Sequence, residues 1–167
     1  MIIDSHCHLT YEPMSNALKE TIDRANKDGI KYMLTISTED KSFEQILKIV
    51  NDFKSVYGTY GIHPHEAKSH QHIKSDDIIN KVNQNKKIIG VGETGLDFYY
   101  NHSEKKDQIY SFEEHISAAQ EKNLPLIVHT RSAEKETLQI LEKHSKKKET
   151  KIPVSYTHLT LPTMIRV

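Results

Sequence analysis

Lys87-Ile88-Ile89-Gly90-Val91-Gly92-Glu93 is a short, almost uninterrupted apolar run that ends on a carboxylate. Its apolar residues do not alternate with polar ones, which is typical of a strand buried on both faces of a parallel sheet. An acidic side chain at the end of such a strand is costly unless it is paired or bound to a cation. The run therefore predicts a covered parallel strand with a functional carboxylate, Glu93, at its end.

The same kind of run recurs before and after this one. Further strands are predicted at 1–8, 31–36, 56–62 and 126–129. Helical spacing of apolar residues predicts helices at 16–27, 41–53, 76–84, 105–122 and 134–146. Strands that alternate with amphipathic helices indicate the α/β class, with a parallel sheet covered by helices.

Polar side chains that suit a functional site follow at least four of the five strands. Parallel barrels and open parallel sheets both place their sites at the carboxyl ends of strands, but polar ligands from several different strand ends fit a barrel better. A complete TIM (β/α)8 barrel takes about 250 residues. The 167 residues therefore predict a partial barrel of about five βα units.

Composition excludes several classes of function. The 23 basic and 23 acidic residues balance to a net charge of zero, so any contact with a nucleic acid must be local. The apolar runs are too short to cross a membrane, and no secretory signal pattern opens the sequence. We expect a cytoplasmic protein without an obligate protein partner. The single cysteine, Cys7, excludes an intramolecular disulfide and is interpreted as a small buried apolar residue.

Eleven histidines are the unusual feature, and two of them form a metal-binding pattern. His6 and His8 are two residues apart in a predicted strand, so both side chains project from the same face. Glu93 and His129 close two further buried strands. The resulting donor set of His6, His8, Glu93 and His129 suits Zn, Mn or Mg, with water in the open positions.

Four motifs follow one another along the chain. They are Asp4-Ser5-His6-Cys7-His8-Leu9, Tyr60-Gly61-Ile62-His63-Pro64-His65-Glu66, Ile89-Gly90-Val91-Gly92-Glu93-Thr94-Gly95-Leu96-Asp97-Phe98-Tyr99-Tyr100 and Leu124-Pro125-Leu126-Ile127-Val128-His129-Thr130-Arg131. Together they make the sequence resemble the TatD family of metal-dependent deoxyribonucleases. The helix between the last two motifs carries the matching residues Gln108, Phe112 and His115. The resemblance covers residues 1 to about 153.

The resemblance implies a TIM-barrel hydrolase with two divalent metals that cleaves DNA phosphodiester bonds, commonly from a 3' end. On that basis His6 and His8 bind one metal, Glu93 bridges both as the catalytic carboxylate, and His129 binds the second. His63 is expected to contact the substrate or leaving group, whereas His65 is expected nearer to the loop surface.

Three further side chains have two open interpretations each. Arg131 is either a phosphate clamp or a partner in a salt bridge at the start of the following helix. Tyr99 and Tyr100 either stack on a base or wedge the loop against the barrel. Four other histidines, at positions 70, 72, 102 and 144, sit in polar surroundings and are expected to be exposed.

The end of the sequence departs from the family. The family supplies another histidine from a sixth strand and a later aspartate, and neither motif is present. Residues 154–167 resemble the translation of a sequencing-library adaptor. We therefore interpret 1–153 as a truncated hydrolase domain and 154–167 as a non-native tail, and we expect the chain as given to be inactive. The alternatives are a non-catalytic metal-binding fragment and a related barrel hydrolase that acts on an amide or lactone.

Overall fold

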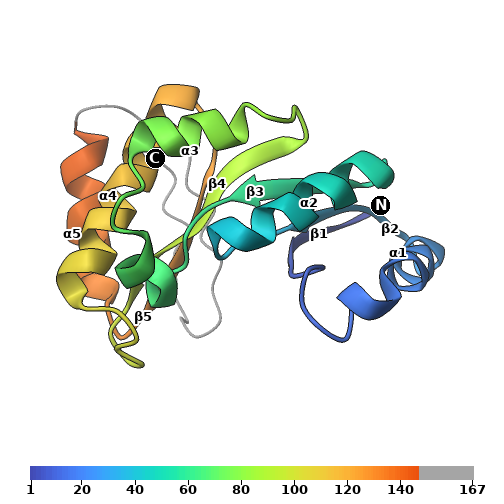
Figure 1. Ribbon diagram of the computed structural model, residues 1–167, viewed down its shortest axis with the longest axis horizontal. Coiled ribbons are helices and arrows are strands. Elements are labelled where there is room, and N and C mark those ends of the chain that lie inside the picture. The colour runs from blue at the N-terminus through green and yellow to red at the C-terminus, as the bar shows by residue number, and fades with distance from the viewer. Residues whose placement is uncertain (147–167) are drawn as a thin grey trace.

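The computed structural model describes residues 1–146 as a single five-stranded sheet with helices along its outer side (Figure 1). The strands are β1 (Ile2–Cys7), β2 (Ile30–Thr35), β3 (Val56–Tyr60), β4 (Ile88–Asp97) and β5 (Leu126–Arg131). All neighbouring strands pair in parallel, and their order in the sheet is their order in the chain. The predicted α/β class is confirmed.

Helices connect successive strands. They are α1 (Leu18–Lys27), α2 (Asp40–Asp52), α3 (Ser75–Val82), α4 (Lys105–Lys122) and α5 (Glu134–Ser145), with the 3-10 segments η1 (Ser15–Ala17) and η2 (Pro64–His70). The strand runs and helices predicted from hydrophobic periodicity are all present, and most of their ends differ by only one or two residues from the prediction. The predicted helix at 105–122 matches α4 at both ends.

The core lies between the sheet and the helices. From α2, the fully buried side chains of Phe43, Ile46 and Val50 pack toward β3. From α4, Phe112 and Ile116 are likewise buried, and the helix contacts both β4 and η2. Each helix thus covers the strands beside it and fixes the positions of the strand ends.

The arrangement is a half-barrel, in agreement with the predicted partial TIM barrel. Within residues 1–146, β1 and β5 lie at opposite ends of the sheet and do not pair with each other. The charged run after α5 and the predicted tail at 154–167 lie largely or wholly outside the described residues. No helix in the described part of the chain is long and apolar enough to cross a membrane.

The fourth strand is longer than the sequence predicts. We predicted its end at Glu93, but β4 continues to Asp97. The extension pairs with β5 through Gly95 opposite His129 and Asp97 opposite Arg131. Gly95 has a φ of +137°, and a Cβ at this position would lie 2.0 Å from the carbonyl oxygen of His129. Only a residue without a side chain permits this close approach of the two strands.

Candidate metal centre

The four predicted metal ligands come together at the carboxyl ends of the strands. His6 lies in β1 and His8 directly follows that strand, while Glu93 lies in β4 and His129 in β5. His63 follows β3, and its imidazole lies beside Glu93 and His129 in the same group of possible ligands. Parallel strands bring their carboxyl ends to one edge, so residues far apart in sequence meet there.

A first donor set is formed by His6, His8 and one oxygen of Glu93. The Nε2 atoms of the two imidazoles are 3.2 Å apart. Glu93 Oε2 lies 3.6 Å from His6 Nε2 and 4.0 Å from His8 Nε2. All three donor atoms therefore converge on one small volume.

A second donor set uses the other oxygen of Glu93. Its Oε1 lies 3.4 Å from His129 Nδ1. A ring nitrogen of His63 lies within the same group of possible ligands. The Glu93 carboxylate thus stands between two imidazole groups and presents a different oxygen to each.

The spacing of these atoms fits a divalent cation. Ligands about 2.1 Å from one ion, at tetrahedral or octahedral angles, lie roughly 3.0 to 3.4 Å from each other. The 3.2 Å between the Nε2 atoms of His6 and His8 and the 3.4 Å between Glu93 Oε1 and His129 Nδ1 fall in this range. Glu93 Oε2 lies somewhat farther from the first two imidazoles, at 3.6 Å and 4.0 Å. His129 also follows the usual pattern of a metal-binding imidazole, because its second nitrogen, Nε2, lies 3.2 Å from a carboxylate oxygen of Asp97.

Asp97 organises the histidines on one side of the site, a role that our sequence interpretation missed. Its side chain is fully buried, and Oδ2 accepts hydrogen bonds from His129 Nε2 at 3.2 Å and from His65 Nε2 at 2.8 Å. Asp97 lies four residues after Glu93 in β4, so both side chains project from the same face of the strand. This spacing is the sequence feature from which its role could have been predicted. The prediction that His65 lies near the loop surface is wrong, because its imidazole is held at the site by Asp97.

Two buried side chains of α4 fix the strand ends that carry these groups. Gln108 Oε1 accepts the Asp97 N–H at 2.8 Å, and its Nε2 donates to the Asp97 carbonyl at 3.0 Å. His115 Nε2 accepts the Ile62 N–H at 3.1 Å, and its Nδ1 donates to the Ser111 carbonyl at 2.7 Å. The first clamp holds the end of β4, and the second holds the backbone next to His63.

Glycines allow β3 and β4 to touch beside the site. A Cβ on Gly61 would lie 2.3 Å from Gly92 Cα and 2.4 Å from its carbonyl carbon. These two glycines immediately precede the segments that carry His63 and Glu93. The contact therefore sets the separation between His63 and the carboxylate.

The electrostatics keep the Glu93 carboxylate charged and the His8 and His63 imidazoles neutral. Burial raises the pKa of Glu93, but the adjacent His129 imidazole and the neighbouring histidines outweigh burial, so its pKa falls below the ordinary value. Burial, followed by the proximity of His129, lowers the pKa of His63 to about 3. Burial also lowers the pKa of His8. Neutral imidazoles keep the lone pairs that metal binding requires.

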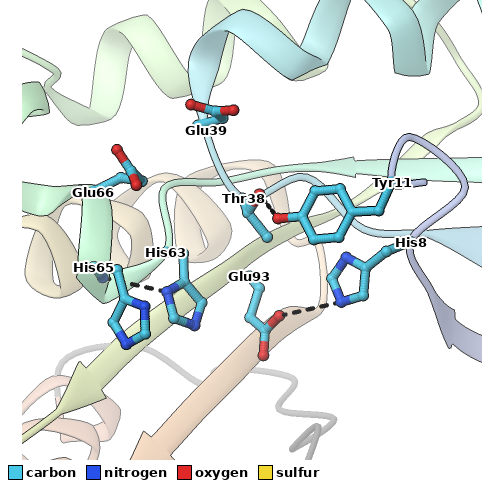
Figure 2. A pocket seen from close by; sticks show the side chains of 8 residues that line it. All are labelled: His8, Tyr11, Thr38, Glu39, His63, His65, Glu66 and Glu93. Atoms are coloured by element: carbon cyan, nitrogen blue, oxygen red, sulfur yellow. Dashed lines mark hydrogen bonds and ion pairs between the residues drawn. The ribbon is translucent and has the colours of Figure 1, made fainter. Parts of the chain in front are cut away.

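A cavity of about 300 Å³ opens beside Glu93 (Figure 2). Its lining consists of His8, Tyr11, Thr38, Glu39, His63, His65, Glu66 and Glu93. The Tyr11 ring stacks on His8 with ring centres 5.0 Å apart, and its hydroxyl lies 2.6 Å from Thr38 Oγ1. Tyr11 therefore supports His8 at the wall of a chamber that leads to the carboxylate.

Arg131 lies close to the site but does not form the predicted alternative salt bridge. In the described residues its guanidinium has no carboxylate partner, and it packs over the rings of Tyr99 and Tyr100. Cys7 is partly buried against the core, and burial followed by the charge of Asp4 raises its pKa to about 12. His144 was expected to be exposed, and this is wrong: it is buried beside Glu113.

The half-barrel and its strand-end donor cluster define the class of metal-dependent hydrolases built on a TIM barrel. The chain belongs to the family described as TatD related DNase, whose model matches residues 3–158. The resemblance seen in the four motifs is thereby confirmed.

Two similar proteins support the family assignment, and both are longer than this chain. An uncharacterized metal-dependent hydrolase of Buchnera aphidicola subsp. Baizongia pistaciae is 33% identical over 150 residues, which cover 87% of this chain and 56% of the relative. The 3'-5' ssDNA/RNA exonuclease TatD of Salmonella typhimurium is 29% identical, with 84% and 54% covered. The chain thus spans about half the length of the curated relatives it matches.

Solved structures of the family share the fold. The YjjV TatD homologue of Escherichia coli K12 superposes with a TM-score of 0.72 at 25% identity, covering 86% of this chain and 56% of that one. A TatD family hydrolase of Entamoeba histolytica has a TM-score of 0.79 at 20% identity, covering 87% and 55%. Both likenesses agree with the half-barrel described above.

Proposed function

We propose that this chain carries the amino-terminal part of a hydrolase that uses two divalent cations to remove nucleotides from the 3' end of DNA. The observation that carries the proposal is the division of the Glu93 carboxylate, with Oε2 toward His6 and Oε1 toward His129. A carboxylate shared between two imidazole groups suits a pair of cations. Paired cations are a recurrent means of stabilising both the attacking and the leaving oxygen in phosphodiester cleavage.

Cations at these donors would be held by His6 and His8 on one side and by His129 on the other, with Glu93 shared between them. Bound Mg, Mn or Zn supplies Lewis acidity, which lowers the pKa of a water molecule and offsets phosphate charge. Glu93 keeps the two donor groups at a fixed separation. Asp97 orients His129 by accepting its Nε2–H, which leaves Nδ1 directed at Glu93.

His63 is proposed to bind the substrate rather than a cation. Its Nδ1 accepts the backbone N–H of His65 at 3.2 Å. Since burial keeps the ring neutral, its single proton is then on Nε2. A neutral Nε2–H is a hydrogen-bond donor for a phosphate or leaving-group oxygen.

Arg131 is proposed to bind a phosphate of the DNA. Its guanidinium offers five N–H donors in a planar arrangement that matches phosphate oxygens. Within residues 1–146 no carboxylate competes for these donors, and two tyrosine rings hold the group in place. The local positive charge suits a chain whose net charge is zero.

We further propose that 1–153 is the natural part of the chain and that 154–167 is not. The remaining strands and metal ligands of the barrel would then be encoded beyond Pro153, and the chain as given would be inactive. Sequencing the gene past the codon for Pro153 tests this. A sixth strand with a His-Cys-Phe-like motif and a later Thr-Asp-like motif supports the proposal, whereas a stop codon soon after Val167 contradicts it.

The activity is tested with the protein in the full length its gene encodes. We expect Mg²⁺ or Mn²⁺ to support release of mononucleotides from single-stranded DNA with a free 3' hydroxyl, and Glu93→Gln to abolish release. Turnover of an amide or lactone panel without nucleotide release would contradict the nuclease and support the related barrel hydrolase. Metal binding with no turnover of either substrate would support the non-catalytic alternative.

A further inference from the structure

We infer that Tyr99 stacks on a nucleobase of single-stranded DNA beside the candidate metal centre. This inference rests on the proposed function and adds a base-binding subsite to it. Tyr99 follows the end of β4, where the buried strand gives way to an exposed turn, and it is 60% exposed. A large exposed aromatic side chain next to a catalytic cluster is the kind of surface that binds bases through their faces.

The ring is held in place by Arg131. The guanidinium carbon lies 4.4 Å from the centre of the Tyr99 ring and 4.5 Å from that of Tyr100. The two rings are 4.8 Å apart and perpendicular, with an interplanar angle of 89°. The cation therefore occupies the corner between two rings, where cation–π attraction restrains all three side chains.

The two tyrosines differ in what remains accessible. Tyr100 also stacks on His102, with ring centres 5.7 Å apart and an angle of 19°, and it meets the edge of His65 at 5.5 Å. Tyr100 therefore contacts Arg131 and two imidazoles, and it is 48% exposed. The ring contacts of Tyr99 are with Arg131 and Tyr100, and more of its surface is open to solvent than that of Tyr100. Tyr99 is thus the ring available to a base, and Tyr100 is its support.

The stacking surface is tied to the candidate metal centre through Asp97. Asp97 Oδ1 accepts the backbone N–H groups of Tyr99 at 3.0 Å and Tyr100 at 3.1 Å. Its other oxygen, Oδ2, binds His129 and His65. One buried carboxylate thus positions a metal-site histidine and the backbone of the aromatic pair, so a base on Tyr99 is placed close to the bond to be cleaved.

This arrangement selects single strands. In a duplex both faces of an internal base are already stacked, whereas a single strand has base faces to offer. Every base has such a face, so the subsite tolerates any sequence. Arg131 would contact a phosphate of the same strand while Tyr99 takes a base, which compensates for the lack of a global positive field.

A simpler role for Tyr99 is to hold Arg131 without touching the base, and a substrate change separates the two. The probes are two 5'-fluorescein-labelled oligothymidylates, one intact and one with abasic residues at its 3' end. Binding to the full-length protein is measured by fluorescence anisotropy in EDTA, which prevents metal-dependent cleavage. We expect the wild-type protein to bind the abasic strand about 10-fold more weakly than the intact strand.

Variants of Tyr99 are then measured on the same two strands. We expect Tyr99→Leu to weaken binding of the intact strand about 10-fold and binding of the abasic strand by no more than about 2-fold, because Tyr100 still holds Arg131, while Tyr99→Phe stays within about 2-fold on both. Tyr110→Leu, at an exposed tyrosine of α4, is the matched control and is expected to change neither. Equal losses on both strands, or equal wild-type affinity for both, would overturn the inference.

Failure of the subsite and failure of the proposed function give different results. Base-dependent binding without nucleotide release in Mg²⁺ or Mn²⁺ would contradict the proposed nuclease activity but support the base-binding subsite. Nucleotide release together with a binding affinity that does not depend on the 3' bases would contradict the subsite but support the nuclease activity.

Discussion

Gln108 binds both backbone groups of Asp97 through its side-chain amide. Oε1 accepts the Asp97 N–H at 2.8 Å, and Nε2 donates to the Asp97 carbonyl at 3.0 Å and to the Ser103 carbonyl at 2.9 Å. Gln108 is fully buried in α4. A helix on the outer side of the sheet therefore determines where the carboxylate behind His129 lies.

Gln108→Leu is expected to destabilise the protein by about 3 kcal/mol. Leucine fills a similar volume but leaves one buried N–H and two carbonyls without this partner, and each unsatisfied group costs roughly 1 to 3 kcal/mol. The free energy of unfolding in urea measures the effect. Gln139→Leu, at an exposed position of α5, is the control and should change stability by less than about 0.5 kcal/mol. Equal stability of the two variants would refute the clamp.

Glu93→Gln is expected to remove shared metal binding while preserving the shape of the site. The amide keeps the size of the carboxylate but loses its charge and one acceptor oxygen. Titration calorimetry of the full-length protein with Mn²⁺ should show two bound ions in the wild type and at most one, about 100-fold weaker, in the variant. The matched control is Glu39→Gln, which lines the same cavity but pairs with Lys41 at 3.0 Å. Unchanged stoichiometry in Glu93→Gln would exclude the bridging role.

Stability is expected to fall as the pH drops from about 6.5 to about 4, in part because of His115. Burial lowers its pKa in the folded protein to about 4 from 6.5, so the unfolded chain binds the proton more readily over this interval. Stability from this group is therefore complete above the unfolded pKa and is lost toward the folded one, by on the order of 3 kcal/mol. Urea unfolding at a series of pH values measures the slope.

The variant His115→Gln isolates this contribution, because glutamine can accept from Ile62 and donate to Ser111 but does not titrate. We expect a flatter dependence of unfolding free energy on pH in this variant. His72→Gln, at an exposed histidine, should retain the wild-type slope. The assignment fails if His115→Gln and the wild type lose stability in parallel.

Gly61→Ala is expected to weaken metal binding together with stability. The added methyl group would meet the Gly92 backbone at 2.3 Å, so β3 and β4 must separate next to His63 and Glu93. Overpacking of this kind costs about 1 to 3 kcal/mol. Gly58→Ala is the comparison, because its methyl group would meet side-chain methyl groups of Ile46 and Ile88 rather than backbone. Gly58→Ala should lower stability but leave Mn²⁺ affinity intact, and an equal affinity loss in both variants would argue against a local effect.

The sequence was sufficient to predict the elements and the convergence of His6, His8, Glu93 and His129. The spacing of residues along a helix or strand determines which side chains share a face. Parallel pairing brings the carboxyl ends of the strands to one edge of the sheet. Those rules apply before any contact is known, and the strand ends that carry these four residues do meet.

Contacts across the fold were not predictable in the same way. Asp97 gains its role only because β4 extends along β5, and the extension depends on the close approach of Gly95 to His129. The sequence predicts His65 near a loop surface, but its hydrogen bond to Asp97 holds the imidazole at the site. His144 lies in a polar run but is covered where α5 meets α4. Each of these outcomes depends on packing between elements rather than on local pattern.

Because each strand of the sheet pairs with the next strand in the chain, the cluster grows in the direction of translation. Of the four predicted metal ligands, the ribosome delivers His6 and His8 first, Glu93 after three strands are complete, and His129 after the other three. A nascent chain can therefore assemble the first imidazole pair and its carboxylate before the second imidazole leaves the exit tunnel. The first donor set would therefore be synthesised before the second is complete.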